Sequence, residues 1–509
     1  MTAWSSAGGT GGWGAGGPPT GQPWVAVRET HSGVVVLWGD RAVKFKKPVD
    51  LGYLDFRAVA DRRRHCQREI TLNRRLAPDV YLGVAEVSDP AGGPPEPAVV
   101  MRRLPEDARL TAVVRRGSGV RDVIDEIARM VASFHSTARR GATIDAQAMP
   151  AAISARWEST FADIARDGGD LLDVAHLRVV RDHVHDFLTG RERLFRSRIT
   201  AGRVVDGHAD LLCDDIFCLA DGPRILDCLD FDDTLRYVDG LDDVACLAMD
   251  LEALGSQYAA RYLFERYTAY AADPAPASLW HHYVAYRAFV RLKVACLRAR
   301  DHDVDAGRTA RTLLDCAVRH LRAGQVRLIL VGGLPGSGKS TVAGGLADRL
   351  HAVLLSSDVL REQEVEPAAG PAPAPFGCGR YDRQHRDQVY QEIFRRAEVL
   401  LEMGETVVVD ASFVDTGHRL LAERAAYRTF SRLVGLRCVA PPEVREQRLR
   451  DRPAGPSQAT VDIARVMAKA ADPWPDSIGL PTTGEPERTL DLALEVVCGG
   501  DRPMSAGDV

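Results

Sequence analysis

A glycine-rich segment that ends in a lysine is the part of this sequence whose spacing points most directly to chemistry. It reads Gly333, Leu334, Pro335, Gly336, Ser337, Gly338, Lys339, Ser340 and Thr341, which fits the pattern G-x-x-x-x-G-K-[ST]. The glycines let successive backbone N–H groups turn inward around an anion, and the lysine reaches the β- and γ-phosphates of a nucleotide. The serine hydroxyl is a ligand for Mg²⁺. The segment therefore predicts a site for ATP and Mg²⁺ at the start of a helix.

Lysine is rare in the rest of the chain, which gives the few lysines more weight. Six lysines occur among 65 basic residues, and three of them cluster at 44–47. Where arginine supplies nearly all positive charge, a lysine is a candidate for a site that needs a compact ammonium. We apply this reasoning to Lys339 and to Lys44, and interpret Lys293 and Lys469 as a consequence of composition.

Two aspartates follow the apolar segments downstream of the glycine-rich loop. Asp358 comes directly after one of them with Arg361 three residues later, and Asp410 ends the run Thr406–Asp410. A carboxylate at the carboxyl edge of a sheet points into the ligand crevice. We expect Asp358 to take a substrate hydroxyl proton, Arg361 to bind an anionic group and Asp410 to bind Mg²⁺. The alternatives are a helix-capping aspartate beside a solvated arginine, and an ordinary turn residue.

Further along, arginines recur at helical spacing before a Pro/Gly break, at Arg445, Arg448 and Arg452. Guanidinium groups at such a place can neutralise charge on a phosphoryl group in transfer. We choose Arg448 and Arg452 for this role. A solvated helix face is the alternative for either residue.

A second group of chemical residues lies in the first half of the chain. His208, Asp210 and Asp215 are spaced as H-x-D-x-x-x-x-[ND], and Asp227 follows on a strand-like run. In kinase-like folds one such aspartate takes the hydroxyl proton and two later oxygen ligands hold the metal on the phosphates. Such a layout also needs a strand lysine and a helix glutamate upstream, and Lys44 and Glu69 occupy those places. Acidic residues also gather in loops without any such function.

These residues need two kinds of scaffold. The first half reads as short strands near residues 24–47 and 97–104, a helix near 56–76, a second strand cluster at 203–227 and helices at 119–195 and 238–323. The second half alternates strand 328–332, helix 339–350, strand 352–356, helix 385–402, strand 406–409, helix 417–431, strand 433–439 and helix 442–451. Alternation of this kind predicts a parallel sheet covered by helices. Residues 366–380 read as a Pro/Ala/Gly-rich loop.

Composition narrows the functional classes. With 509 residues the chain is too long for one hydrophobic core. The net charge of −5 disfavours a nucleic-acid partner. No apolar run is long enough for a transmembrane helix, and the N-terminus lacks the pattern of a signal peptide. Ten cysteines without C-x-x-C pairs indicate a reducing compartment. We therefore expect a cytoplasmic protein without a membrane partner.

Several segments of the first half resemble a known family. They are ETHSGVVVL, AVKFKKPVDLGYLDF, QREITLNRRLAPDVYLG, GHADL and LDFDDTLRYVDGLDDVACLAMDLE. The sequence is similar to a bacterial two-domain family in which an aminoglycoside phosphotransferase-like domain precedes a P-loop predicted kinase, often labelled AAA family ATPase.

The resemblance covers residues from about 24 to 480. It implies that Asp210 is the catalytic base, Asp227 a Mg²⁺ ligand, Lys44 the phosphate lysine, Glu69 its partner and His208 a loop-orienting residue. Two departures stand out: Asp215 replaces the metal-binding Asn of the family, and THSGV (30–34) stands where a Gly-rich loop is usual.

From these observations we predict a multidomain chain. Residues 1–22 form a disordered tail, 23–325 an α+β two-lobed kinase-like domain, 326–498 an α/β P-loop domain and 499–509 a second disordered tail. The first functional hypothesis is a phosphotransferase that uses ATP and Mg²⁺ on a small-molecule hydroxyl. The second is a regulatory protein whose first half senses a metabolite while the second hydrolyses ATP. The third is a kinase of nucleic-acid ends or nucleotide sugars.

Overall fold

The computed structural model describes residues 16–29, 33–50, 55–88, 92–300, 305–363, 383–452 and 459–499. The predicted loop at 366–380 and most of THSGV lie outside these residues, as do most of the two predicted tails. The chain forms two compact units. The first comprises Met1–Leu172, Ser197–Ala275 and Tyr283–Ala317, and the second Asp173–Arg196, Pro276–His282 and Val318–Val509. The domain boundary placed between residues 325 and 326 stays a prediction.

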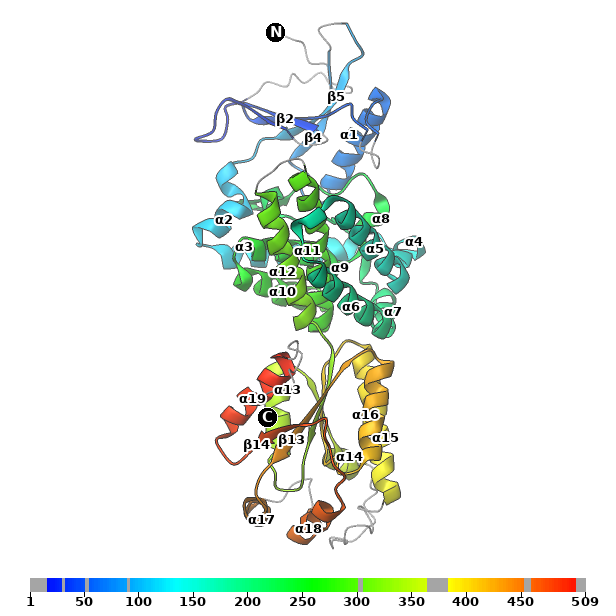
Figure 1. The fold of residues 1–509 in the computed structure, drawn as a ribbon. Coiled ribbons are helices and arrows are strands. Elements are labelled where there is room, and N and C mark those ends of the chain that lie inside the picture. Colours follow the sequence, from blue (N-terminus) through cyan, green and yellow to red (C-terminus); the bar gives the residue numbers. More distant parts are fainter. Residues whose placement is uncertain are drawn as a thin grey trace. The chain divides into compact units, whose positions relative to one another are not determined.

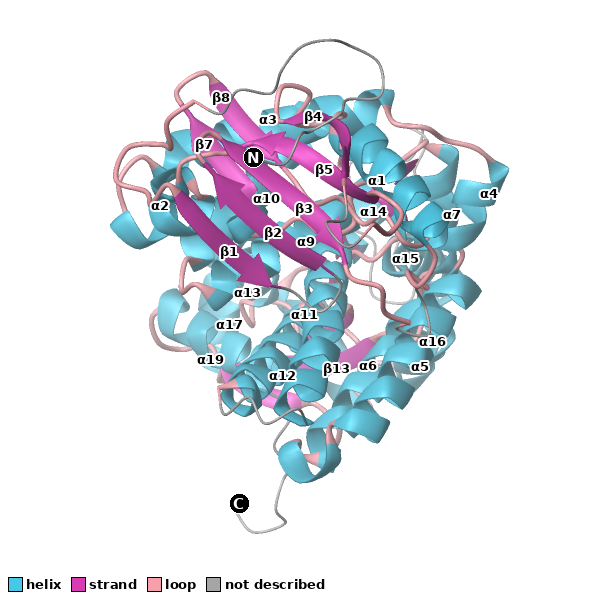
Figure 2. Cartoon of the chain, turned by 90° about the horizontal axis from the view of Figure 1, so that it is seen from above, coloured by secondary structure: helices cyan, strands magenta, loops and turns pink. Residues whose placement is uncertain are grey.

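The first unit begins with a five-stranded antiparallel sheet. Its strands are β1 (Val25–Glu29), β2 (Gly33–Trp38), β3 (Arg41–Lys46), β4 (Tyr81–Val87) and β5 (Glu96–Arg102), in the spatial order β1-β2-β3-β5-β4. Figure 2 shows β1, β2, β3 and β5 side by side. The strands expected near 24–47 and 97–104 are confirmed, whereas β4 was not predicted, although Pro78 and Asp79 form a turn between α1 and this strand.

Helix α1 (Val59–Asn73) packs against β4 and β5. Its buried residues include Arg62, Cys66, Glu69 and Asn73, which recur every three or four positions. This spacing places them on one face of a helix. Because Glu69 belongs to that face, the helix presents a carboxylate to the sheet that carries Lys44.

Helices and short strands make up the rest of the first half of the chain. The helices are α2 (Leu110–Arg116), α3 (Val120–Thr137), α4 (Ala142–Asp145), α5 (Pro150–Asp167), α6 (Val174–Gly190), α7 (Glu192–Thr200), α8 (Asp233–Arg236), α9 (Gly240–Ala253), α10 (Gln257–Tyr270), α11 (Ala277–Arg300) and α12 (Ala306–Ala323). The strands are β6 (Val204–Asp206), β7 (Ile216–Leu219), β8 (Gly222–Ile225) and β9 (Tyr237–Asp239). Pairs β6–β9 and β7–β8 form two antiparallel ribbons that hold the segment from His208 to Asp227.

The second unit contains a five-stranded parallel sheet. Its strands are β10 (Arg327–Gly332), β11 (Val353–Ser356), β12 (Val407–Asp410), β13 (Arg432–Val439) and β14 (Ile478–Pro481), in the order β11-β12-β10-β13-β14. Its helices are α13 (Lys339–Leu350), α14 (Ser357–Gln363), α15 (Arg383–Glu402), α16 (Thr416–Arg428), α17 (Pro442–Asp451), α18 (Val461–Ala470) and α19 (Pro486–Gly499). Helices α13 and α19 cover one face and α15 and α16 the other (Figure 1).

The predicted fold class is confirmed: an α+β part precedes an α/β part with a parallel sheet. Predicted element bounds in the second half agree with the structure within three residues. The agreement has a physical cause, because β10 and β12 are buried on both faces and therefore read as uninterrupted apolar runs. In the described parts of the chain no helix is long and apolar enough to cross a membrane.

Candidate nucleotide sites

The loop between β10 and α13 has the backbone that its glycines predict. Gly333 and Gly336 have φ angles of +134° and +79°, which favour glycine. A Cβ atom on Gly336 would come within 2.5 Å of the Arg445 carbonyl oxygen, so a side chain there would force the loop away from α17. Ser337 Oγ is buried without a hydrogen-bond partner among the described residues. The loop therefore forms a cradle of backbone N–H groups at the amino end of a helix.

Lys339, Ser340 and Asp410 come together beside this cradle. The parallel register pairs Val331 with Asp410, which places the carboxylate at the carboxyl edge of the sheet next to the loop. The Ser340 hydroxyl hydrogen-bonds the Asp410 carboxylate. Burial raises the pKa of Asp410, although the nearby Lys339 ammonium lowers it. Two oxygen ligands and a cation around a phosphate cradle fit Mg²⁺ and a nucleotide triphosphate.

Asp358 and Arg361 form an ion pair in the first turns of α14. Arg361 Nη1 lies 2.6 Å from Asp358 Oδ1. Asp358 is close enough to Asp410 to affect its pKa. The pair therefore stands near the phosphate end of the sheet, with Asp358 Oδ2 outside the ion pair.

The two arginines chosen from helix α17 differ in their contacts. Arg448 Nη2 donates to Thr482 O at 2.6 Å and Nη1 donates to Gly336 O at 3.4 Å, so this side chain is held against the phosphate loop. Arg452 follows the helix and donates to Ala459 O at 3.4 Å. Both side chains line the same cavity, but Arg448 is half-buried whereas Arg452 is exposed, so their role in transfer stays a prediction.

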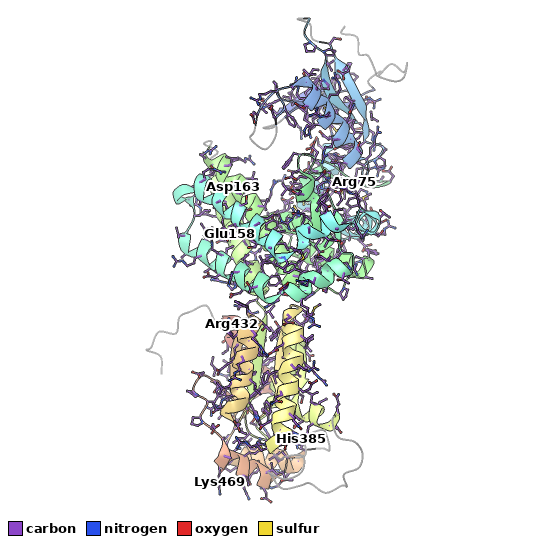
Figure 3. All side chains as sticks on the ribbon, turned by 90° about the vertical axis from the view of Figure 1, so that its right-hand side faces the viewer. Arg75, Glu158, Asp163, His385, Arg432 and Lys469 are labelled. Carbon is purple, nitrogen blue, oxygen red and sulfur yellow. The ribbon has the colours of Figure 1, made fainter. Side chains whose placement is uncertain are left out.

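One cavity of about 420 Å³ contains all of these side chains. It is lined by Lys339, Ser340, Asp358, Arg361, Asp410, Arg448 and Arg452. Figure 3 shows His385, near the start of α15, and Lys469, on α18, at one end of this unit, with Arg432 at the other. Because β13 begins at Arg432, the end with His385 is the carboxyl edge of the sheet, where the cavity lies.

In the first unit, Lys44 is the centre of a charge cluster in which Glu69 is buried, Lys44 is half-buried and the Asp227 side chain is exposed. Its Nζ lies 2.9 Å from Glu69 Oε1 and 2.7 Å from Asp227 Oδ1. Burial alone would lower the pKa of Lys44, but Asp227 and Glu69 outweigh it and hold that pKa well above its usual range. The ammonium in turn lowers the pKa of Asp227. The structure thus joins three predicted residues that lie far apart in the sequence.

The segment with His208 and Asp210 is fixed by a buried carboxylate. Asp243 accepts hydrogen bonds from the backbone N–H groups of His208 and Ala209 at 2.6 and 2.7 Å. His208 Nε2 lies 3.0 Å from Leu226 O, and its Nδ1 accepts from the Asp210 N–H at 3.3 Å. Burial lowers the pKa of His208 to about 4, so its ring is neutral. These contacts orient the loop that presents Asp210.

Asp215 faces two other carboxylates. Burial, Asp227 and Asp210 hold its pKa well above its usual range, and Arg109 acts in the opposite direction. Burial also raises the pKa of Asp210, while Arg291, 3.7 Å away, lowers it. A divalent cation would relieve the repulsion among these oxygen ligands, so the donor set fits Mg²⁺.

Comparison with known proteins agrees with this division of the chain. The family described as AAA domain matches residues 328–472. The uncharacterized proteins Rv2004c of Mycobacterium tuberculosis (strain ATCC 25618 / H37Rv) and Mb2027c of Mycobacterium bovis (strain ATCC BAA-935 / AF2122/97) are each 42% identical over 481 residues. The match covers 94% of this chain and 96% of each relative. The chain belongs to the family of these mycobacterial proteins.

Solved structures are similar to each half of this family member. A choline/ethanolamine kinase family protein from Mesorhizobium loti is 17% identical, with a TM-score of 0.35, and the match covers 59% of this chain and 92% of that one. A gluconokinase from Sinorhizobium meliloti 1021 is 15% identical, with a TM-score of 0.26, covering 34% and 92%. The chain thus combines an α+β part with a P-loop part whose residues 328–472 match the AAA domain family. We call the α+β part the kinase-like domain, after the layout expected for Lys44, Glu69, Asp210, Asp215 and Asp227.

Sequence reasoning missed residues in both domains. In the kinase-like domain Lys46 Nζ lies 2.7 Å from Glu69 Oε2 and 3.1 Å from Asp230 Oδ2, so Glu69 serves two lysines. The alternation of side chains along a strand could have indicated this second ion pair, since Lys44 and Lys46 lie on the same face of β3. In the P-loop domain the cavity is also lined by Arg386, Tyr390, Ser412 and His418. No motif marks Arg386 and Tyr390 on α15 or His418 on α16, because these helices meet only in the tertiary structure, whereas Ser412 follows Asp410 by two residues.

Proposed function

We propose that the chain is a phosphotransferase that moves the γ-phosphate of ATP, bound with Mg²⁺, to the hydroxyl of a small molecule at the P-loop site. The observation that carries the proposal is the cavity that contains a phosphate cradle, a metal-binding pair and an aspartate–arginine pair at once. A site that only hydrolysed ATP would not need the last pair. We place this reaction in the cytoplasm, because it consumes ATP.

Asp358 acts as the base in this reaction. Arg361 holds its Oδ1 at 2.6 Å, which leaves Oδ2 to take the proton of the acceptor hydroxyl. The acceptor oxygen forms a bond to the γ-phosphorus while the bond from phosphorus to the bridging oxygen of ADP breaks. Lys339, Arg448 and Arg452 stabilise the negative charge that spreads over the transferring group. Mg²⁺ held by Ser340 and Asp410 would neutralise charge on the phosphates.

Arg361 gives the acceptor end of the cavity its charge. It is paired with Asp358 at 2.6 Å, and Arg386 brings a second guanidinium group to the lining of the same cavity. An anionic group on the acceptor is therefore favoured there and a cationic one is disfavoured. A small anionic hydroxyl compound suits this charge better than a nucleic-acid end, which would bring many negative charges to a chain of net charge −5.

The kinase-like domain is proposed as a second nucleotide site. Lys44, paired with Glu69, would bind the phosphates, Asp215 and Asp227 would hold Mg²⁺, and Asp210 would be the base. The alternative for this half is a metabolite sensor that regulates the P-loop domain. Asp215 favours that alternative, because it places an additional negative charge beside the triphosphate.

The proposal is tested on the full chain with Asp210→Asn, which removes the proposed base of the kinase-like domain. ATP consumption is measured against pooled hydroxyl metabolites, and phosphorylated products are identified by mass spectrometry. Lys339→Ala should nearly abolish turnover, since it removes several kcal/mol of transition-state stabilisation, roughly a hundredfold or more in rate. Turnover within about twofold of the parent would refute the P-loop assignment.

Asp358→Asn separates transfer from binding in the same assay. It should abolish product formation and leave ATP affinity within about twofold, because this carboxylate faces the acceptor. If ATP affinity fell as far as turnover, Asp358 would be a metal-binding residue instead. Continued ATP hydrolysis without any phosphorylated product would favour the regulatory alternative.

A further inference from the structure

The lining of the P-loop cavity includes a buried histidine with one ring nitrogen that lacks a hydrogen-bond partner among the described residues. His418 lines the cavity with only 3% of its surface exposed. Its Nε2 lies 2.8 Å from Asp387 Oδ1. Its Nδ1 is buried and has no hydrogen-bond partner among the described residues.

Two helices fix the plane and the direction of this ring. Asp387 and Tyr390 lie one turn apart on α15, so both face the first turn of α16, where His418 stands. The Tyr390 ring stacks on the imidazole with centroids 3.7 Å apart and planes at 7°. The Tyr390 hydroxyl accepts from the Phe413 N–H at 3.1 Å and lies 3.4 Å from Ser412 Oγ. Ring rotation would therefore break several contacts.

The partner of Nε2 decides what Nδ1 can do. An ionised carboxylate only accepts hydrogen bonds, so Nε2 carries the proton that is shared with Asp387. Burial lowers the pKa of His418, although Asp387 and Asp415 act against it and Arg386 acts with it. The neutral ring then offers a lone pair at Nδ1. A buried acceptor without a donor costs about 1–3 kcal/mol, which a ligand donor would recover.

We propose that Nδ1 of His418 accepts a hydrogen bond from a second hydroxyl of the acceptor, so that the P-loop site selects polyhydroxylated acceptors. The inference rests on the proposed function, in which Asp358 takes the first hydroxyl. A volume of about 420 Å³ accommodates a nucleotide phosphate tail and a compact polyol. His418 is thus a specificity-determining residue, held in place by Asp387 and Tyr390.

The test uses the full chain carrying Asp210→Asn and pairs of matched probes. D-gluconate and 6-hydroxyhexanoate have the same carbon chain, carboxylate and terminal hydroxyl, and differ in the inner hydroxyls. D-sorbitol and 1-hexanol form an uncharged pair, and other aldonates and hexoses extend the panel. We expect kcat/KM for the best polyhydroxylated probe to exceed that of its monohydroxy partner by at least about tenfold, the worth of one or two hydrogen bonds.

Three variants separate recognition from structure. His418→Phe keeps the stack on Tyr390 but has no acceptor, so KM for the polyhydroxylated probe should rise about tenfold while KM for ATP stays within about twofold. His418→Gln supplies an amide oxygen and should restore part of the affinity. Asp387→Asn is the matched control: the asparagine oxygen still accepts from Nε2–H, so the acceptor preference should remain. A purely structural His418 would change Tm and kcat without altering the ratio between the paired probes.

The remaining outcomes are distinct. Binding is followed by calorimetry with a nonhydrolysable ATP analogue. A polyhydroxylated probe that binds through His418 but is not phosphorylated would overturn the proposed function and support the role of His418. Equal transfer to both members of a pair would overturn the inference and support the proposed function. An unchanged KM in the His418→Phe variant would have the same meaning, because Nδ1 of the parent would then be hydrogen-bonded to water rather than to the acceptor. No binding of any probe would overturn both.

Discussion

The two lysines that we propose to bind phosphates are held in different ways. Lys44 is locked between two carboxylates at 2.9 and 2.7 Å, whereas Lys339 donates only to the Leu334 carbonyl at 3.4 Å. A compact ammonium on a flexible stem suits both situations. Because Lys339 lacks a short ion pair among the described residues, it can turn to a phosphate at less cost than Lys44. This difference favours the P-loop site as the more readily loaded of the two.

Asp215 leads to a prediction about metal-dependent binding. Replacing it by Asn removes one of the mutually repelling carboxylates beside Asp210 and Asp227 and keeps an oxygen ligand. We expect Asp215→Asn to keep or improve the affinity of the kinase-like domain for ATP with Mn²⁺, and Asp227→Ala to lose it. The measurement is calorimetry on the full chain carrying Lys339→Ala. An ATP affinity that is the same with and without Mn²⁺ would show that this domain is not a metal-dependent nucleotide site.

His208 gives a pH prediction. Its pKa is lowered from 6.5 to about 4 in the fold, so the unfolded chain binds more protons in this window. The free energy of unfolding should therefore fall as pH drops from about 6.5 towards about 4, by up to about 3 kcal/mol from this group. His208→Gln should flatten that part of the profile in denaturant unfolding followed at several pH values. An equally steep profile in the variant would assign the acid sensitivity to other groups.

At the scale of elements, the sites depend on where strands end. Asp410, at the end of β12, is paired with Val331 of β10 on one side and with Ser356 of β11 on the other. Its carboxylate therefore lies where three strands end. The glycine-rich loop after β10 curves around the space next to the Asp410 carboxylate. Parallel strands make this convergence general, since their carboxyl ends meet at one edge.

The phosphate loop allows a matched pair of glycine substitutions. Gly336→Ala places a Cβ at φ +79° and 2.5 Å from the Arg445 carbonyl oxygen, whereas a Cβ on Gly344, inside α13, meets nothing within 4 Å. We expect Gly336→Ala to weaken ATP binding at least about tenfold and to destabilise the fold by about 1–3 kcal/mol. Gly344→Ala should leave binding unchanged and stabilise α13 by about 0.5–1 kcal/mol. Calorimetry and denaturant unfolding measure both, and similar behaviour of the two variants would contradict the loop geometry.

At the scale of the whole molecule, each compact unit carries one set of the residues that we propose to bind phosphate. We expect calorimetry to find two ATP molecules per full chain in the presence of Mg²⁺. Lys339→Ala should remove one site and Lys44→Ala the other, each leaving its counterpart intact. If either single substitution removed both sites, the two units would share one nucleotide or depend on each other for binding. If the parent bound only one ATP, the kinase-like domain would be the sensor of the alternative hypothesis.

The sequence by itself determined the phosphate loop, the alternation of the P-loop domain and the places of Asp358, Arg361 and Asp410. These follow from local rules, since a loop between a buried strand and a helix and a residue just past a strand are defined by near neighbours in the chain. The places of Lys44 and Glu69 were expected from the kinase-like layout and their pairing from the family resemblance, whereas the ion pair between Lys44 and Asp227 was not predicted.

Only the tertiary structure decided the rest. It showed that Lys46 shares Glu69, that Asp243 holds the His208 loop and that His418 lies against Asp387 and Tyr390 in the P-loop cavity. These contacts join residues from helices and strands that no spacing rule connects. Their geometry depends on how α1 packs on its sheet and how α15 packs on α16, which side-chain packing fixes and local sequence does not.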